Sequence, residues 1–217
     1  MKTIIQVVLW IVSLGFGYLI YKSVNAPIEF KKVKIERFTE VISVMKDIKK
    51  SQEAYRTVQG RFARDFKSLV AFVDTANYTI TQQRDSSYFE FDKTYGIDVL
   101  KEVKIIDTLG LVSVKDSLFK KDNRYKNMMT IPHTVNNAKF VMSSKVIDIS
   151  GYRAPVFEVK ANKSLILHDQ PADLLLAENT IGKDIKEISG TDIIVGSLEE
   201  VSTNGNWPPV YDRKDKK

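Results

Sequence analysis

The sequence contains no cysteine among its 217 residues, and this absence limits the chemistry that the chain can carry. Disulfide bonds, thiolate catalysis and cysteine-based zinc or iron–sulfur sites are excluded, because each of them needs a cysteine sulfur. The only two histidines, His133 and His168, are far apart and lie in no His-Glu-x-x-His helix. They therefore predict no metal site.

Loops that bind phosphate or calcium are also missing. Gly182, Lys183 and Asp184 have no upstream glycine at the spacing of a P-loop. The aspartates are scattered and do not follow the spacing that folds a backbone around calcium. The net charge is +6, but basic residues do not alternate with stacking aromatics along any segment. We therefore expect no cofactor, no metal and no nucleic-acid partner.

His168 and Asp169 could act as a catalytic base and its orienting carboxylate, with Ser164 nearby in the sequence. Adjacent residues on a strand or turn point in different directions, however, and the residues around Ser164 do not resemble a nucleophile elbow. We therefore expect His168 to be a surface residue and the chain to have no catalytic residues.

A long apolar segment lies at the N-terminal end, where Ile4 to Tyr21 carries no charge between Lys2 and Lys22. A helix of these 18 residues spans about 27 Å, close to the thickness of the hydrocarbon core of a bilayer. We expect residues 1–26 to form a membrane anchor that contacts lipid. The anchor residues named from this segment are Ile4, Val7, Trp10, Leu14, Tyr18 and Tyr21.

A cleavable signal peptide is the competing interpretation, because Val24, Asn25 and Ala26 have the small-residue character of a cleavage site. The apolar run is longer than the usual signal-peptide core of about 7–15 residues. Pro27 would also follow the cut, where its missing N–H fits a protease poorly. A retained anchor is favoured, and Pro27 is expected to interrupt or kink the helix.

The orientation of this anchor is contested by the charges that flank it. Lysines and an arginine soon after the span would keep the following domain in the cytoplasm under the positive-inside rule. These residues are Lys22, Lys31, Lys32, Lys34 and Arg37.

A second helix, amphipathic this time, is predicted beyond Pro27. Its apolar face recurs at intervals of three and four residues, with one polar position at Gln52. The residues of this packing or partner face are Phe38, Val41, Met45, Ile48 and Tyr55. Like-charged neighbours such as Lys46 and Lys50 do not support the helix, so packing of its apolar face must hold it.

A joint follows at the end of that helix. Gly60 suits a helix C-terminus because it adopts the left-handed conformation without penalty. Asp65 can cap a short helix in which Leu69 and Val73 lie on the apolar face. Residues 27–76 are therefore expected to form an amphipathic helix, a glycine turn and a short helix, with Gly60, Phe62, Asp65 and Leu69 as the joint.

This arrangement resembles the type IV pilins and type II secretion pseudopilins on Tyr55, Gly60, Phe62, Leu69 and Val73. The resemblance implies that the long helix packs on a C-terminal antiparallel sheet, and that the domain is extracytoplasmic. The Gly-Phe-Thr-Leu-x-Glu processing motif of that family is absent.

The C-terminal two thirds of the sequence predicts mostly strands. The candidates are 88–91, 111–114, 138–149, 156–161 and 193–198, with 101–106 as a strand or a helix. Residues 150–155 supply a turn, 171–178 a helix, and Trp207 a plug at the end of the domain. The segments 115–119, 155–161 and 195–211 are similar to uncharacterised single-pass membrane proteins of the Bacteroidota.

The predicted fold is α+β, with a transmembrane helix that continues into an amphipathic helix packed on an antiparallel sheet. Residues 77–212 form one β-rich domain with the preceding helices, and 213–217 a charged tail. We expect a non-enzymatic, inner-membrane subunit of a secretion, pilus-like or motility complex, with a periplasmic domain and envelope proteins as partners. Two alternatives stay open: a membrane-anchored ligand-binding or carboxylate-based enzyme domain, and a cytoplasmic adaptor held to anionic lipid by Lys31, Lys32 and Lys34.

Overall fold

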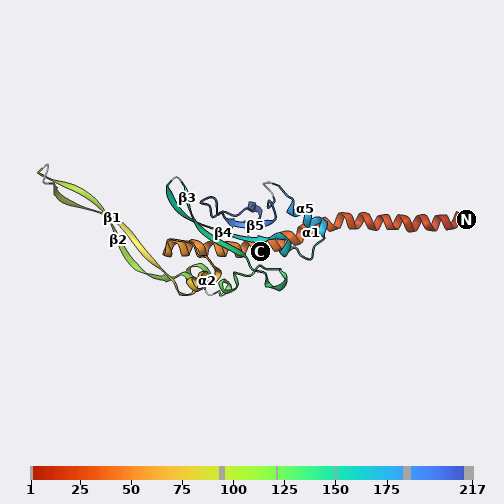
Figure 1. The fold of residues 1–217 in the computed structure, drawn as a ribbon, viewed down its shortest axis with the longest axis horizontal. Helices are drawn as coiled ribbons and strands as arrows, with labels where there is room; N and C mark the ends of the chain where they lie inside the picture. The colour runs from red at the N-terminus through yellow and green to blue at the C-terminus, as the bar shows by residue number, and fades with distance from the viewer. Residues whose placement is uncertain (1, 93–95, 121, 150, 183–186, 213–217) are drawn as a thin grey trace.

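The computed structural model describes residues 2–92, 96–120, 122–149, 151–182 and 187–212. It combines helices with two separate antiparallel sheets along one long axis (Figure 1). Helix α1 lies along that axis, with the N-terminus at one end of the molecule. The strands β1 and β2 extend past the other end. The charged tail expected at 213–217 lies outside the described residues.

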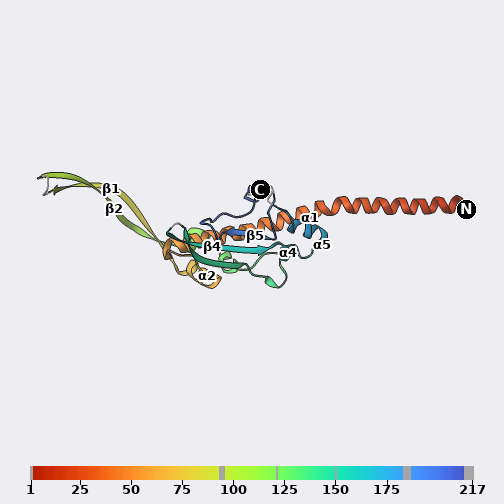
Figure 2. The same ribbon diagram turned by 45° about the horizontal axis from the view of Figure 1, so that its top comes forward.

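Helix α1 runs without a break from Lys2 to Gln59, so the expected interruption at Pro27 is wrong. Proline removes one backbone donor, at a cost of about 3 kcal/mol in a helix interior. The helix continues on both sides, and its C-terminal half is held by packing against the body of the protein (Figure 2). The apolar segment and the amphipathic segment are therefore parts of one continuous helix.

The turn after α1 is made by Gly60, which has a φ of +72° and donates its N–H to the carbonyl of Arg56 at 2.8 Å. Helix α2 then spans Phe66–Thr75, and Asp65 caps it by accepting from the Ser68 N–H at 2.7 Å. Three buried residues of α2, Leu69, Phe72 and Val73, join the core.

Strands β1 (Asn77–Asp92) and β2 (Ile97–Ser113) pair with each other in an antiparallel ribbon. The ribbon joins the body at its base, where the Val114 N–H donates to the Ala76 carbonyl at 3.0 Å. Beyond that point it extends away from the body in both views (Figures 1 and 2). Residues 101–106 are thus strand, and the short strands expected at 88–91 and 111–114 belong to one long pair, with Val114 opening a helix.

The second sheet has the order β3–β4–β5, with β3 at Val141–Ile149, β4 at Tyr152–Asn162 and β5 at Asp192–Gly196. The expected combination of a long helix with a C-terminal antiparallel sheet is confirmed, and the strands β1 and β2 form a second, separate sheet. The turn predicted over 150–155 is shorter, because Tyr152 to Pro155 pair with β3. Strand β5 pairs only with residues 158–162 of β4, so the edge of β4 that faces β5 is unpaired at Pro155. A proline, which lacks an N–H, costs no hydrogen bond between strands at such an edge.

Short helices connect these elements. They are α3 (Val114–Phe119), α4 (Lys163–Ile166), α5 (Ala172–Asn179), and the 3₁₀ turns η1 (Arg124–Asn127), η2 (Val135–Asn137) and η3 (Pro209–Asp212). The core forms where the C-terminal half of α1 meets α2, β4 and β5. Trp207 is half-buried and packs at the margin of this core.

Candidate functional site

The first candidate surface is the N-terminal part of α1. Its six named residues, Ile4, Val7, Trp10, Leu14, Tyr18 and Tyr21, are all more than half exposed. Among the described residues this is the one helix that is long and apolar enough to cross a membrane. The span is therefore compatible with a single membrane crossing, because so much apolar surface is unfavourable in water.

The apolar face of α1 beyond the span is covered by the chain itself. Phe38, Val41, Met45 and Ile48 are fully buried, and Tyr55 is half-buried with its ring 4.8 Å from that of Phe72. This face contributes to the core of the protein, so no part of these four side chains is left for a partner helix.

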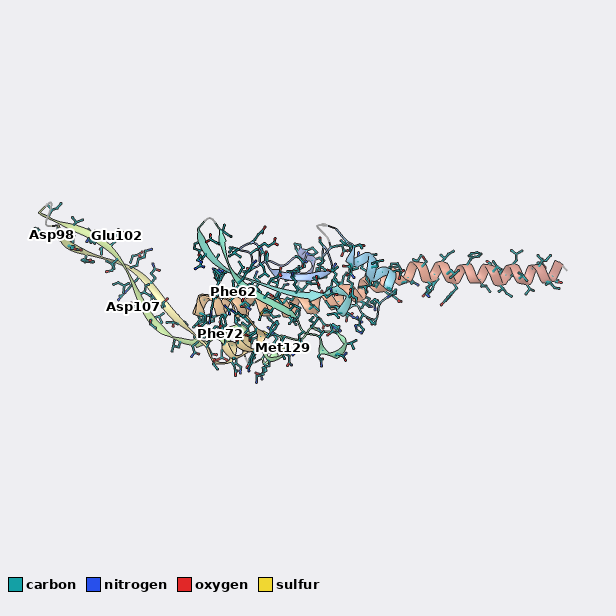
Figure 3. All side chains as sticks on the ribbon, in the orientation of Figure 1. Phe62, Phe72, Asp98, Glu102, Asp107 and Met129 are labelled. Atoms are coloured by element: carbon teal, nitrogen blue, oxygen red, sulfur yellow. The ribbon has the colours of Figure 1, made fainter. Side chains whose placement is uncertain are left out.

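Gln52, the polar position on this face, is fully buried and clamps the joint. Its Oε1 accepts from the N–H of Ala63 at 2.9 Å, and its Nε2 donates to the Ala63 carbonyl at 3.2 Å. Next to Ala63, the buried ring of Phe62 (labelled in Figure 3) lies 4.6 Å from that of Phe157 on β4. The end of α1 is thereby attached to the sheet.

A cluster of four charges, three of them buried and Glu187 partly exposed, joins α1 to the C-terminal part of the protein. Lys34 Nζ lies 2.9 Å from Glu178 and 2.7 Å from Glu187. Glu178 also pairs with Lys163 at 2.9 Å, and Lys163 donates to the carbonyl of Ile188 at 2.6 Å. Burial alone would lower the pKa of Lys34, but the hydrogen bonds and charges of both glutamates outweigh it and raise that pKa.

This charge cluster was not predicted from the sequence, which named Lys34 only as one of the basic residues after the span and as a lipid contact. Lys34 is 5% exposed, so in the folded chain it is not available to a membrane surface. Burial also raises the pKa of the Tyr211 hydroxyl, and the nearby charges of Glu187 and Glu178 add to that effect. The cluster connects α1 to the C-terminal part of the protein, and each of its charges has a partner of opposite sign.

The suspected pair of His168 and Asp169 does not form a catalytic arrangement. Arg37 binds both carboxylate oxygens of Asp169, at 2.5 and 2.8 Å. His168 is exposed and its Nδ1 lies 3.2 Å from the Leu165 carbonyl oxygen. Ser164 Oγ accepts from Asn179 Nδ2 at 2.9 Å, and no hydrogen bond among the described residues joins it to a histidine. The expectation that His168 is a surface residue is confirmed.

The other histidine borders a groove of about 350 Å³ between α1 and the segment 124–137. His133 Nε2 lies 2.7 Å from Glu40, and its backbone has a φ of +59°. Asp47 is the only carboxylate among the described residues that line the groove, and it is paired with Arg124 at 2.8 Å. Among the described residues, no group of three or more histidine, aspartate or glutamate side chains could hold a metal ion.

The second candidate surface is the ribbon itself. Large apolar side chains are exposed on both of its faces, with Phe89, Leu100 and Ile106 on one face and Tyr88, Ile97 and Val99 on the other. A two-stranded ribbon is at best marginally stable in water without further packing. Exposed apolar surface of this kind is a feature of interaction sites, and it makes the ribbon a candidate surface. The sequence predicted only separate short strands in this region, because apolar residues on both faces of the ribbon obscure the alternation that identifies a long strand.

Comparisons with known proteins yield no match to a protein-family model, to a curated protein or to a solved structure. The two exposed apolar surfaces, the span and the ribbon, are therefore the candidate functional surfaces of the chain.

Proposed function

We propose that the chain is a non-enzymatic, single-pass subunit of a cell-envelope complex, anchored in the inner membrane with its domain on the periplasmic side. One observation carries the proposal. A single uninterrupted helix leads from an exposed apolar segment at one end of the molecule to a body whose far end bears an exposed apolar ribbon (Figure 1). The anchor holds the body at a membrane, and the ribbon binds a protein partner away from it.

The dimensions support this division of roles. A helix of 58 residues is about 87 Å long, and about 30 Å of it suffices to cross a bilayer core. The 16 residues of β1 add about 53 Å beyond the body. The ribbon can therefore contact proteins that lie far from the membrane surface.

The pilin-like part of the proposal is supported by the place of α1. Its N-terminal part is exposed, while its C-terminal half packs beside the antiparallel sheet of β3, β4 and β5. Secretion, pilus-like and motility complexes use subunits with such an anchor, and we place the chain in that class.

Membrane fractionation and crosslinking in cells test the proposal. The photoreactive residue p-benzoylphenylalanine is placed at Phe89 on the ribbon or, as a control, at Tyr152, an equally exposed aromatic residue on the body. We expect the chain to stay in the membrane pellet after carbonate extraction. We also expect adducts from position 89 and few from position 152.

Orientation is tested with Tyr152→Cys, the only thiol in a chain that lacks cysteine. A membrane-impermeant maleimide should label this variant in intact spheroplasts. Labelling only after lysis, release of the chain by carbonate, or the absence of any adduct from position 89 would each contradict the proposal.

A further inference from the structure

A groove of about 520 Å³ lies where the body of the protein meets the end of the apolar span. One wall is a face of α1 that begins at Leu19 and ends at Pro27, and the other is the start of α5 with Pro171 before it. Both views place α5 at the end of the body from which the span leaves (Figures 1 and 2). The groove is therefore separate from the ribbon, which extends past the other end.

The length of the span sets the level of this groove in a membrane. The apolar run ends at Tyr21, and Lys22 is the first charge after it. With the span in a bilayer, Leu19 lies at the edge of the hydrocarbon core, and the helix from Lys22 to Pro27 rises about 9 Å beyond that edge. The polar layer on each side of the core is about 5–8 Å thick. The groove therefore lies at the level of the lipid headgroups.

The segment that forms the second wall is held against α1 on both sides. Before it, Asp169 is bound by Arg37, and at its far end Glu178 is bound by Lys34. Both basic residues lie beyond the groove along α1, on the side away from the span. The chain between the two ion pairs must therefore reach back toward the span to line the groove. Residues 170–177 thus form a fixed projection of the body toward the membrane.

The groove offers one charge of each sign. Lys22 and Asp173 are the only charged side chains among the described residues that line it. Both are exposed, and neither forms an ion pair with another described residue. A ligand that carries one negative and one positive group therefore matches the groove better than an anion or a cation alone.

A backbone acceptor adds to this pattern. In an α-helix the carbonyl of Ser23 would accept from the N–H four residues along, but Pro27 at that position has no N–H. Both residues line the groove. The Ser23 carbonyl thus lacks its helical donor at a place where a ligand can supply one. Together with the Asp173 carboxylate, it favours a ligand whose positive group carries N–H donors.

We propose that the groove binds a zwitterionic phospholipid with a primary ammonium group, which is the headgroup chemistry of phosphatidylethanolamine. The ammonium donates to the Asp173 carboxylate and to the Ser23 carbonyl, while Lys22 binds the phosphate. Leu19 and Leu174, which also line the groove, contact the adjoining part of the lipid tails. The bound lipid attaches the body to the membrane at a second point beside the span and restricts its tilt.

This inference rests on the membrane anchor of the proposed function, but not on the ribbon or on the orientation of the domain. Native mass spectrometry of the full chain, released from detergent micelles, tests it. The delipidated chain is titrated with phosphatidylethanolamine, phosphatidylcholine or phosphatidylglycerol that carry the same acyl chains. Choline has no N–H donor, and the glycerol headgroup has no cation, so each comparison removes one feature that the groove is proposed to recognise.

We expect phosphatidylethanolamine to bind at least about tenfold more tightly than either of the other lipids, because it alone forms the charged hydrogen bonds to Asp173. Equal binding of the three lipids would identify non-specific contact with the span and overturn the proposal. Preferential binding of phosphatidylglycerol would identify a site for anionic lipid and overturn it as well.

Variants of the two charges give a second readout. Asp173→Asn should reduce the binding of phosphatidylethanolamine to about that of phosphatidylcholine, and Lys22→Gln should weaken all three lipids because each carries the phosphate. Glu29→Gln is the matched control, since Glu29 is an exposed carboxylate on α1 outside the groove. A preference that survives Asp173→Asn, or that is lost equally in Glu29→Gln, would contradict the site.

These outcomes are distinguishable from failure of the proposed function. Release of the chain by carbonate would remove the anchor and the lipid site together. A chain that stays in the membrane and gives adducts from position 89, but shows no lipid preference, would overturn the lipid site alone. Labelling that places the domain in the cytoplasm would contradict the proposed orientation, while a measured preference for phosphatidylethanolamine would still support the site.

Discussion

Gln52 and Ala63 are joined by two hydrogen bonds, one to each backbone group of Ala63. The pair connects the body of α1 to the segment that leaves it, eleven residues further along the chain. Both residues are almost completely buried, so water cannot replace either bond. A polar residue on an otherwise apolar helix face thus fixes the direction in which the chain turns after Gly60.

We expect Gln52→Leu to destabilise the folded chain by about 2–4 kcal/mol, because the N–H and C=O of Ala63 would be buried without partners. Gln59→Leu, at the exposed end of α1, is the control and should change stability by less than about 0.5 kcal/mol. Urea unfolding of the full chain in detergent, followed by circular dichroism, measures both. Equal stability of the two variants would show that the clamp does not hold the joint.

Glu178→Gln should lower stability by about 3–5 kcal/mol, because Lys34 and Lys163 would lose the carboxylate that they share inside the protein. Asp122→Asn removes a carboxylate from an exposed pair with Arg124 and should have little effect. The same unfolding measurement compares them. A small loss for Glu178→Gln would mean that water enters the cluster and screens its charges.

Met45→Asp and Ile48→Asp should each prevent stable folding, or cost more than about 4 kcal/mol, because they place an unpaired charge in the core. Lys50→Asp, on the exposed side of α1, should be tolerated. Limited proteolysis of the membrane-bound chain distinguishes these outcomes. A variant that keeps its protease resistance while losing a partner would instead identify this helix face as an interaction surface.

The stability of the chain should fall in acid partly through Asp169. Its hydrogen bonds with Arg37 hold the pKa of the carboxyl well below its usual range. Because the folded-state pKa is the lower one, the pair stabilises the protein above about pH 4. That contribution is lost as the pH falls through the folded-state pKa.

The size of this effect is modest, about 0.5–1 kcal/mol, because the Asp169 side chain is 45% exposed and its charge is screened by water. Urea unfolding at pH 7 and pH 3 should show a smaller pH effect for Asp169→Asn than for the original chain. An identical pH dependence of the two proteins would exclude this ion pair as a source of acid sensitivity.

Features that depend on neighbouring residues could be predicted. The spacing of Phe38, Val41, Met45 and Ile48 indicates a helix face, and the same four side chains are buried in the structure. Helix caps are similarly local, since Asp65 accepts from a residue three positions along. The continuity of α1 through Pro27 could not be predicted, because it depends on the packing of distant parts of the chain against the helix.

The sequence by itself determined the apolar span, the buried face of α1 and the turn at Gly60, because each depends on residue types at short spacing. Only the tertiary structure decided the charge cluster, in which Lys34 meets residues more than a hundred positions away. It also decided the length of the ribbon, since β1 becomes a strand by pairing with β2 and not by its own alternation. Contacts of this kind arise from the global packing of the chain, and a local pattern carries no record of them.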